Sequence, residues 1–330
     1  MFASIQDKKV LFISTKNLNY IRNTQEIELL HTYATSCDIV GSNASTYISR
    51  LLHIYYRLLF LNVHTYDAIF IGFAPQLILP IFHRKFKQKL IIADFFISMY
   101  DTFCCDRQKI KPDSPVGKLF HYLDTLTLQK CDIVVCDTKA HASYFSEEFH
   151  TDISRMHTLY LEADNSIYHP MHVTRPVHLQ DKFIVLYFGS ILPLQGIETV
   201  LQAFDYLKNK AHIHFFCIGP IKEKELTIPK PISEHITYID WLSQEELAKY
   251  IAMSDLCLAG HFHPTIQKAK RTIPGKAYIY HAMKKPMILG DNPANHELFD
   301  NDTFVTFVEM GNARALANEI LRQSAKHGLP

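Results

Sequence analysis

Short apolar runs alternate with amphipathic segments along the first half of the chain. The runs are rich in Ile, Val, Leu and Phe, and charged or turn residues bound them. Continuous apolar runs of this length are typical of strands buried on both faces of a parallel sheet. The pattern predicts strands over residues 10–14, 38–41, 68–73, 89–97, 132–137 and 157–161, and helices over 24–35, 45–61, 75–86, 115–129 and 140–149.

The alternation stops at residues 163–182 and then begins again. This stretch carries Pro170, Pro176 and several histidines without a sustained period, which is typical of a linker. Strands that alternate with helices form βαβ units and a parallel sheet. The second half is predicted to hold strands over 183–189, 213–219, 236–239, 256–259, 286–289 and 304–307, and helices over 196–209, 243–252, 276–283 and 313–325.

The pattern therefore predicts an α/β protein with two doubly wound, Rossmann-like domains that face a cleft. We expect the N-terminal domain over residues 1–165, a linker at about 166–179 and the C-terminal domain over 180–330. The terminal helix belongs to the C-terminal domain or packs back on the N-terminal one. A chain of 330 residues has the length of two ordinary domains.

Composition narrows the class of protein. Hydrophobic residues make up 48% of the chain, and the net charge is +1, so the charge balance predicts no nucleic-acid partner. The seven cysteines contain no Cys-x-x-Cys pair, which argues against a disulfide framework or a zinc site. Four of them lie in apolar runs and favour a reduced, cytoplasmic setting. The N-terminal sequence lacks the apolar core of a signal peptide.

The longest apolar stretch, residues 48–63, is too short and too polar to span a bilayer. It is interrupted by Arg50, His53, Arg57 and Asn62. Two interpretations stay open. Its cations and tyrosines suit a membrane surface, which would make the protein peripheral on the inner membrane face, and they also suit a buried helix with polar edges.

Ligands bind beyond the carboxyl ends of the strands in open parallel sheets. Gly189 and Ser190 follow the first strand of the second half, and a helix is predicted to begin near Gly196. Small residues let a ligand approach the backbone, and helix-start amides attract anions. Glycine is also common in turns that bind nothing, so this signal is weak alone.

A basic segment further along carries more information. Lys268, Lys270, Arg271 and Lys276 precede or begin a helix, and Pro274 with Gly275 forms the turn between them. Cations beside a helix N-terminus are suited to a diphosphate. The alternative is a solvated basic loop.

Polar residues also follow the predicted strand at 89–97. Asp94, Ser98 and Asp101 are candidates to meet an acceptor, with Asp94 and Asp101 as catalytic carboxylates. Each of them is equally suited to capping a loop or a helix.

Three further residues are weaker candidates. Trp241, the sole tryptophan, follows a strand and is suited to stacking on a base or to packing in the core or between the domains. His261 and His263 have metal-ligand spacing, but no third ligand is near, so we expect no metal and a polar contact for His263.

These positions together resemble the family 4 glycosyltransferases, which are retaining nucleotide-sugar enzymes of bacterial polysaccharide synthesis. The resemblance is best in YFGSILPLQGIETVLQAF, ITYIDWLSQEELAKYIAMSDLCL and IPGKAYIYHAMKKPMILGDNPANHELF, with weaker echoes in LYLEADNSIYHP and FFISMYDTFCCDRQ. It implies the GT-B fold, a UDP- or GDP-sugar held mainly by the C-terminal domain, and a glycan or lipid-linked acceptor held by the N-terminal domain. It implies no metal and no other cofactor.

The sequence departs from the family at several polar positions. Ser190 and Gln195 stand where the family has Arg and Lys, and Arg271 and Ile279 stand where it has paired glutamates. Phe96 stands near the N-domain histidine of some members. The expected donor-binding residues are those that the resemblance implies and the cations that would compensate for these losses. They are Gly189, Ser190, Gln195, Trp241, Leu242, His263, Arg271, Lys276 and Ile279.

Three functions remain open on these grounds. The leading one is transfer of a sugar from a nucleotide diphosphate to an acceptor. The second is a catalytically degraded GT-B subunit that binds glycan or supports an active partner subunit. The third is a sugar-nucleotide epimerase, for which the sequence offers no distinctive acid and base set.

Overall fold

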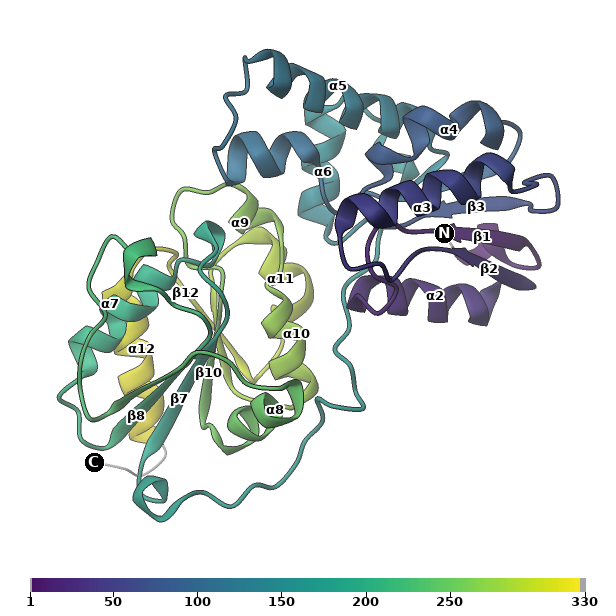
Figure 1. The fold of residues 1–330 in the computed structure, drawn as a ribbon. Helices are drawn as coiled ribbons and strands as arrows, with labels where there is room; N and C mark the ends of the chain where they lie inside the picture. The colour runs from purple at the N-terminus through teal and green to yellow at the C-terminus, as the bar shows by residue number, and fades with distance from the viewer. Residues whose placement is uncertain (1, 327–330) are drawn as a thin grey trace. The chain divides into compact units, whose positions relative to one another are not determined.

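The computed structural model describes residues 2–326, and the chain divides into two compact units, Met1–Glu162 and Ala163–Pro330 (Figure 1). Each unit contains one six-stranded sheet in which every pair of neighbouring strands is parallel. Helices cover both faces of each sheet. The fold is therefore two α/β, Rossmann-like domains, as the alternation of strands and helices predicts.

The N-terminal sheet has the strand order β2-β1-β3-β4-β5-β6. The chain reverses its direction of winding at β1, so the carboxyl ends of β1 and β3 lie at the switch point where such sheets bind ligands. Each strand predicted in this half is present. The strands are β1 (Lys9–Ile13), β2 (Ser36–Val40), β3 (Ala68–Ile71), β4 (Leu90–Asp94), β5 (Ile133–Cys136) and β6 (Met156–Thr158).

Alternate residues of these strands form two cores. Leu11 and Ile13 point to one face, where they join apolar residues of α3, α4, α5 and α6. Val10 and Phe12 point to the other face, beneath α1 and α2. The helices are α1 (Phe2–Ile5), α2 (Ile21–Tyr33), α3 (Tyr47–Phe60), α4 (Leu79–Phe86), α5 (Pro115–Lys130) and α6 (Lys139–Glu148).

The C-terminal sheet has the order β12-β11-β10-β7-β8-β9. Its central strand β7 is buried along nearly its whole length, which explains the continuous apolar run in its sequence. The strands are β7 (Phe183–Phe188), β8 (Ile213–Ile218), β9 (Ile236–Ile239), β10 (Leu256–Gly260), β11 (Met287–Gly290) and β12 (Val305–Val308).

Helices of the C-terminal unit lie on both faces of this sheet. Helices α7 and α12 pack together on one face, over Phe183, Val185 and Tyr187, and α8 and α10 contact strands on the other (Figure 1). The terminal helix α12 packs on α7 and β12 of its own unit. The helices are α7 (Ile197–Leu207), α8 (Gln244–Met253), α9 (Lys268–Arg271), α10 (Gly275–Ala282), α11 (Pro293–Phe299) and α12 (Ala313–Lys326).

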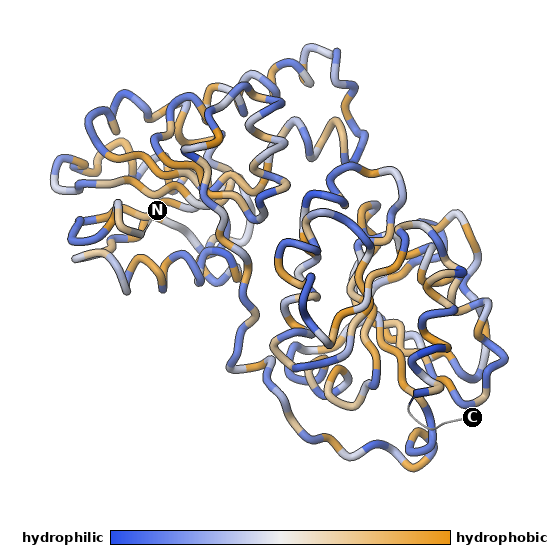
Figure 2. Tube along the Cα trace, turned by 180° about the vertical axis from the view of Figure 1, so that it is seen from behind, coloured by the Kyte–Doolittle hydropathy of each residue, from blue (hydrophilic) through white to orange (hydrophobic). Residues whose placement is uncertain are grey.

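Hydropathy along the chain follows this layering. Figure 2 shows hydrophobic residues along the strands inside each unit and hydrophilic residues along the loops that connect them. Residues 163–176, between the units' regular elements, contain neither helix nor strand. Within the part of the chain that the structure describes, no helix is both long and apolar enough to cross a bilayer.

Several short elements were not predicted from sequence, three of them near candidate residues or the loops that follow strands. A π-helix, η2 (Asp101–Asp106), follows β4, and α9 occupies the segment interpreted as a basic turn. Helix α11 begins at Pro293, where Asn292 caps it by accepting from the backbone N–H of Asn295. Elements this short carry too little periodicity to be recognised from a single sequence.

Candidate functional site

Backbone segments crowd together at the carboxyl ends of β7 and β8. Gly189 follows β7 and Gly219 follows β8, and both have positive φ. A Cβ atom built on Gly219 would lie 2.0 Å from the carbonyl oxygen of Gly189. The two loops can approach this closely only because residue 219 has no side chain.

The loop after β10 joins the same edge of the sheet. The N–H of Phe262 donates to the carbonyl of Gln195 over 3.1 Å. A Cβ on Gly196 would lie 2.5 Å from the backbone nitrogen of His263, so the start of α7 fits tightly against this loop. The turn that the sequence singled out at residues 189–196 therefore lies where the loops after β7, β8 and β10 converge.

Lys276 enters this edge from the first turn of α10. Its Nζ donates to Oε1 of Gln195 over 2.8 Å and lies 3.9 Å from the ring centroid of Tyr187. The Tyr187 hydroxyl donates to the same Gln195 oxygen over 2.9 Å. A Cβ on Gly189 would lie 3.4 Å from Lys276 Nζ, so the ammonium lies directly beneath the glycine turn.

Burial sets the electrostatics of this lysine. Only 5% of Lys276 is exposed, and loss of solvent lowers the pKa of its ammonium well below the ordinary lysine range. No acidic side chain within residues 2–326 forms an ion pair with it. Its contacts are an amide oxygen and an aromatic ring, so the site carries a cation, when protonated, without a protein counter-charge.

Other predicted donor residues lie around this edge with different exposure. Ser190 is exposed beside Gly189, and Gln195 is half-buried. Trp241 follows β9 and is 77% exposed, while the next residue, Leu242, is half-buried. An exposed indole is available to a ligand, and this geometry removes the interpretation of Trp241 as a core residue.

Three more candidates lie on α9, α10 and the β10 loop. Nδ1 of His263 accepts from the backbone N–H groups of Thr265 and Ile266 over 3.3 and 3.2 Å, which orients the imidazole. Arg271 ends α9 and is half-buried. Ile279 lies half-buried on α10, one turn beyond Lys276.

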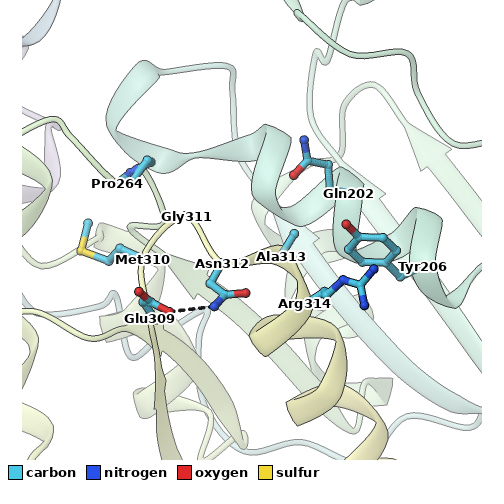
Figure 3. Close-up of a pocket in the computed structure, with 9 residues that line it drawn as sticks. All are labelled: Gln202, Tyr206, Pro264, Glu309, Met310, Gly311, Asn312, Ala313 and Arg314. Atoms are coloured by element: carbon cyan, nitrogen blue, oxygen red, sulfur yellow. Dashed lines mark hydrogen bonds between the residues drawn. The ribbon is translucent and has the colours of Figure 1, made fainter.

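A separate open pocket of about 440 Å³ lies between α7 and the start of α12 (Figure 3). Tyr206 and Gln202 line it from α7, and the Arg314 guanidinium lies 5.4 Å from the Tyr206 ring centroid. Glu309 accepts from Asn312 over 2.7 Å on the opposite wall. None of the predicted donor residues lines this pocket, so it is distinct from the Lys276 site.

In the N-terminal unit, Asp94 is engaged by an arginine that sequence reasoning missed. Arg22 Nε and Nη2 donate to its two carboxylate oxygens over 3.1 and 3.0 Å, and neither residue is more than 3% exposed. Glu26 lies 3.5 Å from Arg22 Nε. Burial, followed by the charge of Asp94, raises the pKa of the Glu26 carboxyl well above its usual range.

Ser98 and Asp101 are also buried. The Ser98 hydroxyl donates to Asp124 over 2.6 Å and accepts from the N–H of Asp101 over 2.9 Å. Asp124 additionally accepts from Gln76 and from two backbone amides, which ties the loop after β4 to α5. The structure therefore gives Asp94 and Ser98 contacts that shape the loop, and their predicted catalytic and acceptor roles remain predictions.

A histidine lies beside Asp101 that no sequence signal singled out. His141 Nδ1 is 2.7 Å from Asp137 Oδ1, its Nε2 is 3.9 Å from Asp101 Oδ2, and the ring is fully buried. Asp137 follows β5, and His141 lies in the first turn of α6. The spacing of four residues across a strand-to-helix turn was the only signal available, and it is common in proteins without function.

The accessible part of this edge is aromatic and basic. Tyr20, Phe73 and Phe96 pack together with ring centroids 5.8 to 6.4 Å apart. Lys16 Nζ lies 5.6 and 5.3 Å from the Tyr20 and Phe73 centroids. All four residues are half-buried and follow β1, β3 or β4. No group of three potential metal ligands occurs among the described residues.

Comparison of the sequence with models of protein families gives a match for one segment of the chain. Residues 182–325 match the family model described as Glycosyl transferases group 1. The match covers nearly all of the C-terminal unit, including the glycine turn, Trp241 and Lys276, and less than half of the chain. No curated protein matches the sequence.

Solved structures extend the likeness to both units. A glycosyltransferase from Rickettsia africae has a TM-score of 0.68 at 15% identity, covering 98% of this chain and 89% of its own. Sucrose-phosphate synthase from Thermosynechococcus elongatus has a TM-score of 0.67 at 12% identity, covering 98% and 91%. Anabaena HepE, solved with UDP-glucose, has a TM-score of 0.63 at 12% identity, covering 97% and 91%.

At these identities the likeness establishes the fold, which is that of GT-B glycosyltransferases. The segment that matches the group 1 family model includes the glycine turn after β7. Gln195 occupies the position where the family resemblance implies a lysine, and Lys276 donates to the amide oxygen of Gln195. A basic side chain thus reaches the turn from α10, which is a different element.

Proposed function

We propose that this chain is a glycosyltransferase that moves a sugar from a nucleotide diphosphate, such as a UDP- or GDP-sugar, to an acceptor. The acceptor is a glycan or a lipid-linked glycan, the setting is bacterial cell-surface polysaccharide synthesis in the cytoplasm, and transfer retains the anomeric configuration. The observation that carries the proposal is Lys276, a buried amino group beneath a glycine turn with no acidic partner among the described residues.

The energetic argument starts from the cost of burying this group. An unpaired ammonium in a low-dielectric site is unfavourable, and proteins ordinarily pair or neutralise it. A ligand that brings two negative phosphates supplies the missing counter-charge and restores the charged form. Strongly perturbed lysines at the ligand-binding edge of a sheet favour a functional role for this reason.

The remaining donor contacts follow from the elements that meet there. The backbone amide of Ser190 suits the diphosphate, with Arg271 as a second cation, whereas the N–H of Gly189 donates to the carbonyl of Ile218. The exposed indole of Trp241, with Leu242 beside it, suits the base, and His263 suits a hydroxyl of the sugar or ribose. Ile279 replaces a ribose-binding carboxylate by a van der Waals contact.

Sugar transfer breaks the bond between the anomeric carbon and the diphosphate oxygen, and negative charge develops on the leaving group. A fixed ammonium and helix-start amides stabilise that charge without a metal ion. On the acceptor side, Lys16 with Tyr20, Phe73 and Phe96 offers aromatic faces and a cation to a sugar. The buried contacts of Asp94, Asp101 and Ser98 favour positioning of that edge over direct contact with the acceptor.

The test is titration of the full chain with UDP, GDP, TDP and their common sugar conjugates, with and without a glycan acceptor. Lys276→Met is compared with Lys284→Met, which removes an exposed lysine beyond the C-terminal end of α10. We expect a thermal shift with at least one nucleotide, weakened only by Lys276→Met. Absence of any shift for the wild type would reject the proposal.

A degraded GT-B subunit remains the second candidate, because Ser190 and Gln195 replace two phosphate-binding cations of the family resemblance. Loss of two charged hydrogen bonds costs about 3–6 kcal/mol of binding free energy. If only one of Lys276 and Arg271 binds the phosphates, it offsets this cost only in part. Transfer of a sugar from donor to acceptor by the purified chain, without a partner subunit, would exclude this candidate. Turnover of a UDP-sugar without acceptor would instead favour an epimerase.

A further inference from the structure

Helix α3 exposes an apolar stripe to solvent. Ile48, Leu52, Tyr56, Leu59 and Phe60 are 72, 63, 66, 63 and 76% exposed. Their spacing places them on one side of the helix, and the rings of Tyr56 and Phe60 pack on each other with centroids 5.1 Å apart. Soluble proteins rarely leave several large apolar side chains adjacent and uncovered, so this stripe favours a binding surface.

The opposite side of α3 is the one that packs on the sheet. Ile54 and Leu58 are fully buried in the core of the N-terminal unit. The helix is thus apolar on both faces, a composition normally found where a helix is surrounded by protein or meets a membrane. Ile81 of α4, which is 59% exposed, adds to the uncovered apolar surface of this unit.

A basic pocket begins where the stripe ends. This open pocket, of about 460 Å³, is lined by Leu61, His64, Arg84, Lys85 and Lys87 among others, and none of its lining residues is acidic. Lys85 Nζ donates to the carbonyls of Leu58 and Leu59 at the C-terminal end of α3, over 2.5 and 2.8 Å. That bond joins the basic pocket to the apolar helix as one surface.

Most charged residues in this region are basic. Residues 41–90 contain six Lys or Arg and a single acidic residue, Asp67, which accepts from the N–H of Lys9. Arg57 lies on the exposed side of α3 between the apolar residues. Apolar side chains interleaved with cations match a surface that is negatively charged outside and hydrocarbon inside.

We propose that α3 and the basic pocket dock this protein on an anionic phospholipid bilayer. The stripe enters the boundary between headgroups and acyl chains, and the pocket formed by Arg84, Lys85 and Lys87 receives lipid phosphates. A second copy of the chain is a poorer occupant, because a symmetric contact would bring these cations against one another. The proposal stands on residues of the N-terminal unit alone and does not require the proposed glycosyl transfer.

The experiment is flotation of the full chain with vesicles of phosphatidylglycerol and phosphatidylcholine in equal parts, and with phosphatidylcholine alone. The wild type is expected to float with the anionic vesicles at low salt and to be released by added salt. No flotation with anionic vesicles, or equal flotation with both compositions, overturns the proposal.

Two sets of variants locate the surface. Leu52→Ser with Phe60→Ser should lower partitioning about tenfold or more. Arg84→Glu with Lys87→Glu should lower it by about fivefold or more per cation on anionic vesicles. The matched controls are Ile232→Ser, at a side chain that is 89% exposed in the C-terminal unit, and Lys224→Glu, at another exposed residue there.

All of these positions are exposed, and thermal unfolding should confirm that each variant folds like the wild type. Variants of the surface that float as well as the controls overturn the proposal. A wild type that forms dimers, which Leu52→Ser with Phe60→Ser dissociates, and that ignores anionic vesicles also overturns it. Lys276→Met, in the other unit, should float like the wild type, which separates this result from the test of glycosyl transfer.

Discussion

The ammonium of Lys276 lies 2.8 Å from the amide oxygen of Gln195, although 81 positions separate the two residues in sequence. Gln195 comes from the glycine turn after β7 and Lys276 from the first turn of α10. The contact brings a basic side chain to the place that a lysine at position 195 would otherwise fill. We therefore infer that Lys276 of α10, and not a side chain of the turn, binds the phosphates.

Replacing this lysine should separate stability from binding. Lys276→Met removes a buried ammonium and keeps an apolar side chain of similar length, so folded stability should stay level or rise by about 1 kcal/mol. Gln195 keeps its hydrogen bond from Tyr187. Thermal unfolding checks this, with Lys284→Met as the control. A large fall in melting temperature would mean that Lys276 maintains the fold instead of the ligand site.

A lysine placed at position 195 should restore the nucleotide binding that Lys276→Met weakens. Lys276→Met alone should weaken UDP or GDP binding by about 10- to 100-fold, since a charged hydrogen bond is lost. Adding Gln195→Lys to that variant places a single cation at the same turn, and affinity should recover by about tenfold. Isothermal titration measures both variants. Equal affinity of the single and double variants would contradict the idea that one cation serves either position.

Gly219 should tolerate no side chain. Its φ is +138°, and an added Cβ would meet the Gly189 carbonyl oxygen at 2.0 Å, so Gly219→Ala must displace backbone at the site. We expect a loss of about 2–4 kcal/mol in unfolding free energy, together with weaker nucleotide binding. Gly41→Ala is the control, because its Cβ would meet only the flexible side chain of Leu18. Urea unfolding of both variants distinguishes the two sites, and similar small losses would contradict the prediction.

Glu26 should make stability depend on pH. Burial and the charge of Asp94 raise the pKa of Glu26, so the folded state holds a proton that the unfolded state releases. Its contribution is fully present below the ordinary carboxyl pKa and is lost as the pH rises through the folded value. Glu26→Gln should flatten this slope, measured by urea unfolding between about pH 4 and pH 8. Glu28→Gln, on the exposed side of α2, should leave the slope unchanged.

The sequence predicts the fold well because burial on both faces leaves a continuous apolar run in each strand. Phe183–Phe188 and Ile213–Ile218 are such runs, and turn residues mark their ends. The cluster of four cations near the start of α10 is also visible in the sequence. The family resemblance narrows the four to Arg271 and Lys276, but sequence alone does not show that Lys276 is the one buried beneath Gly189.

Other features depend on pairings between distant positions. Asp94 reads from sequence as an accessible carboxylate after a strand, but Arg22, 72 positions away, binds it in the core. The stretch at 48–63 left two interpretations open, a membrane surface and a buried helix. The structure buries one face of α3 and exposes an apolar second face, a distinction that periodicity does not make when both faces are apolar.

Proton uptake on nucleotide binding tests the central claim most directly. Because desolvation lowers the pKa of Lys276, a bound diphosphate should raise it again and draw a proton into the site. Calorimetric titration of UDP and GDP in buffers with different ionisation enthalpies measures that proton. We predict uptake by the wild type and by Lys284→Met, and no uptake together with weaker binding by Lys276→Met. Nucleotide binding with the same affinity and the same proton uptake in Lys276→Met would contradict the account.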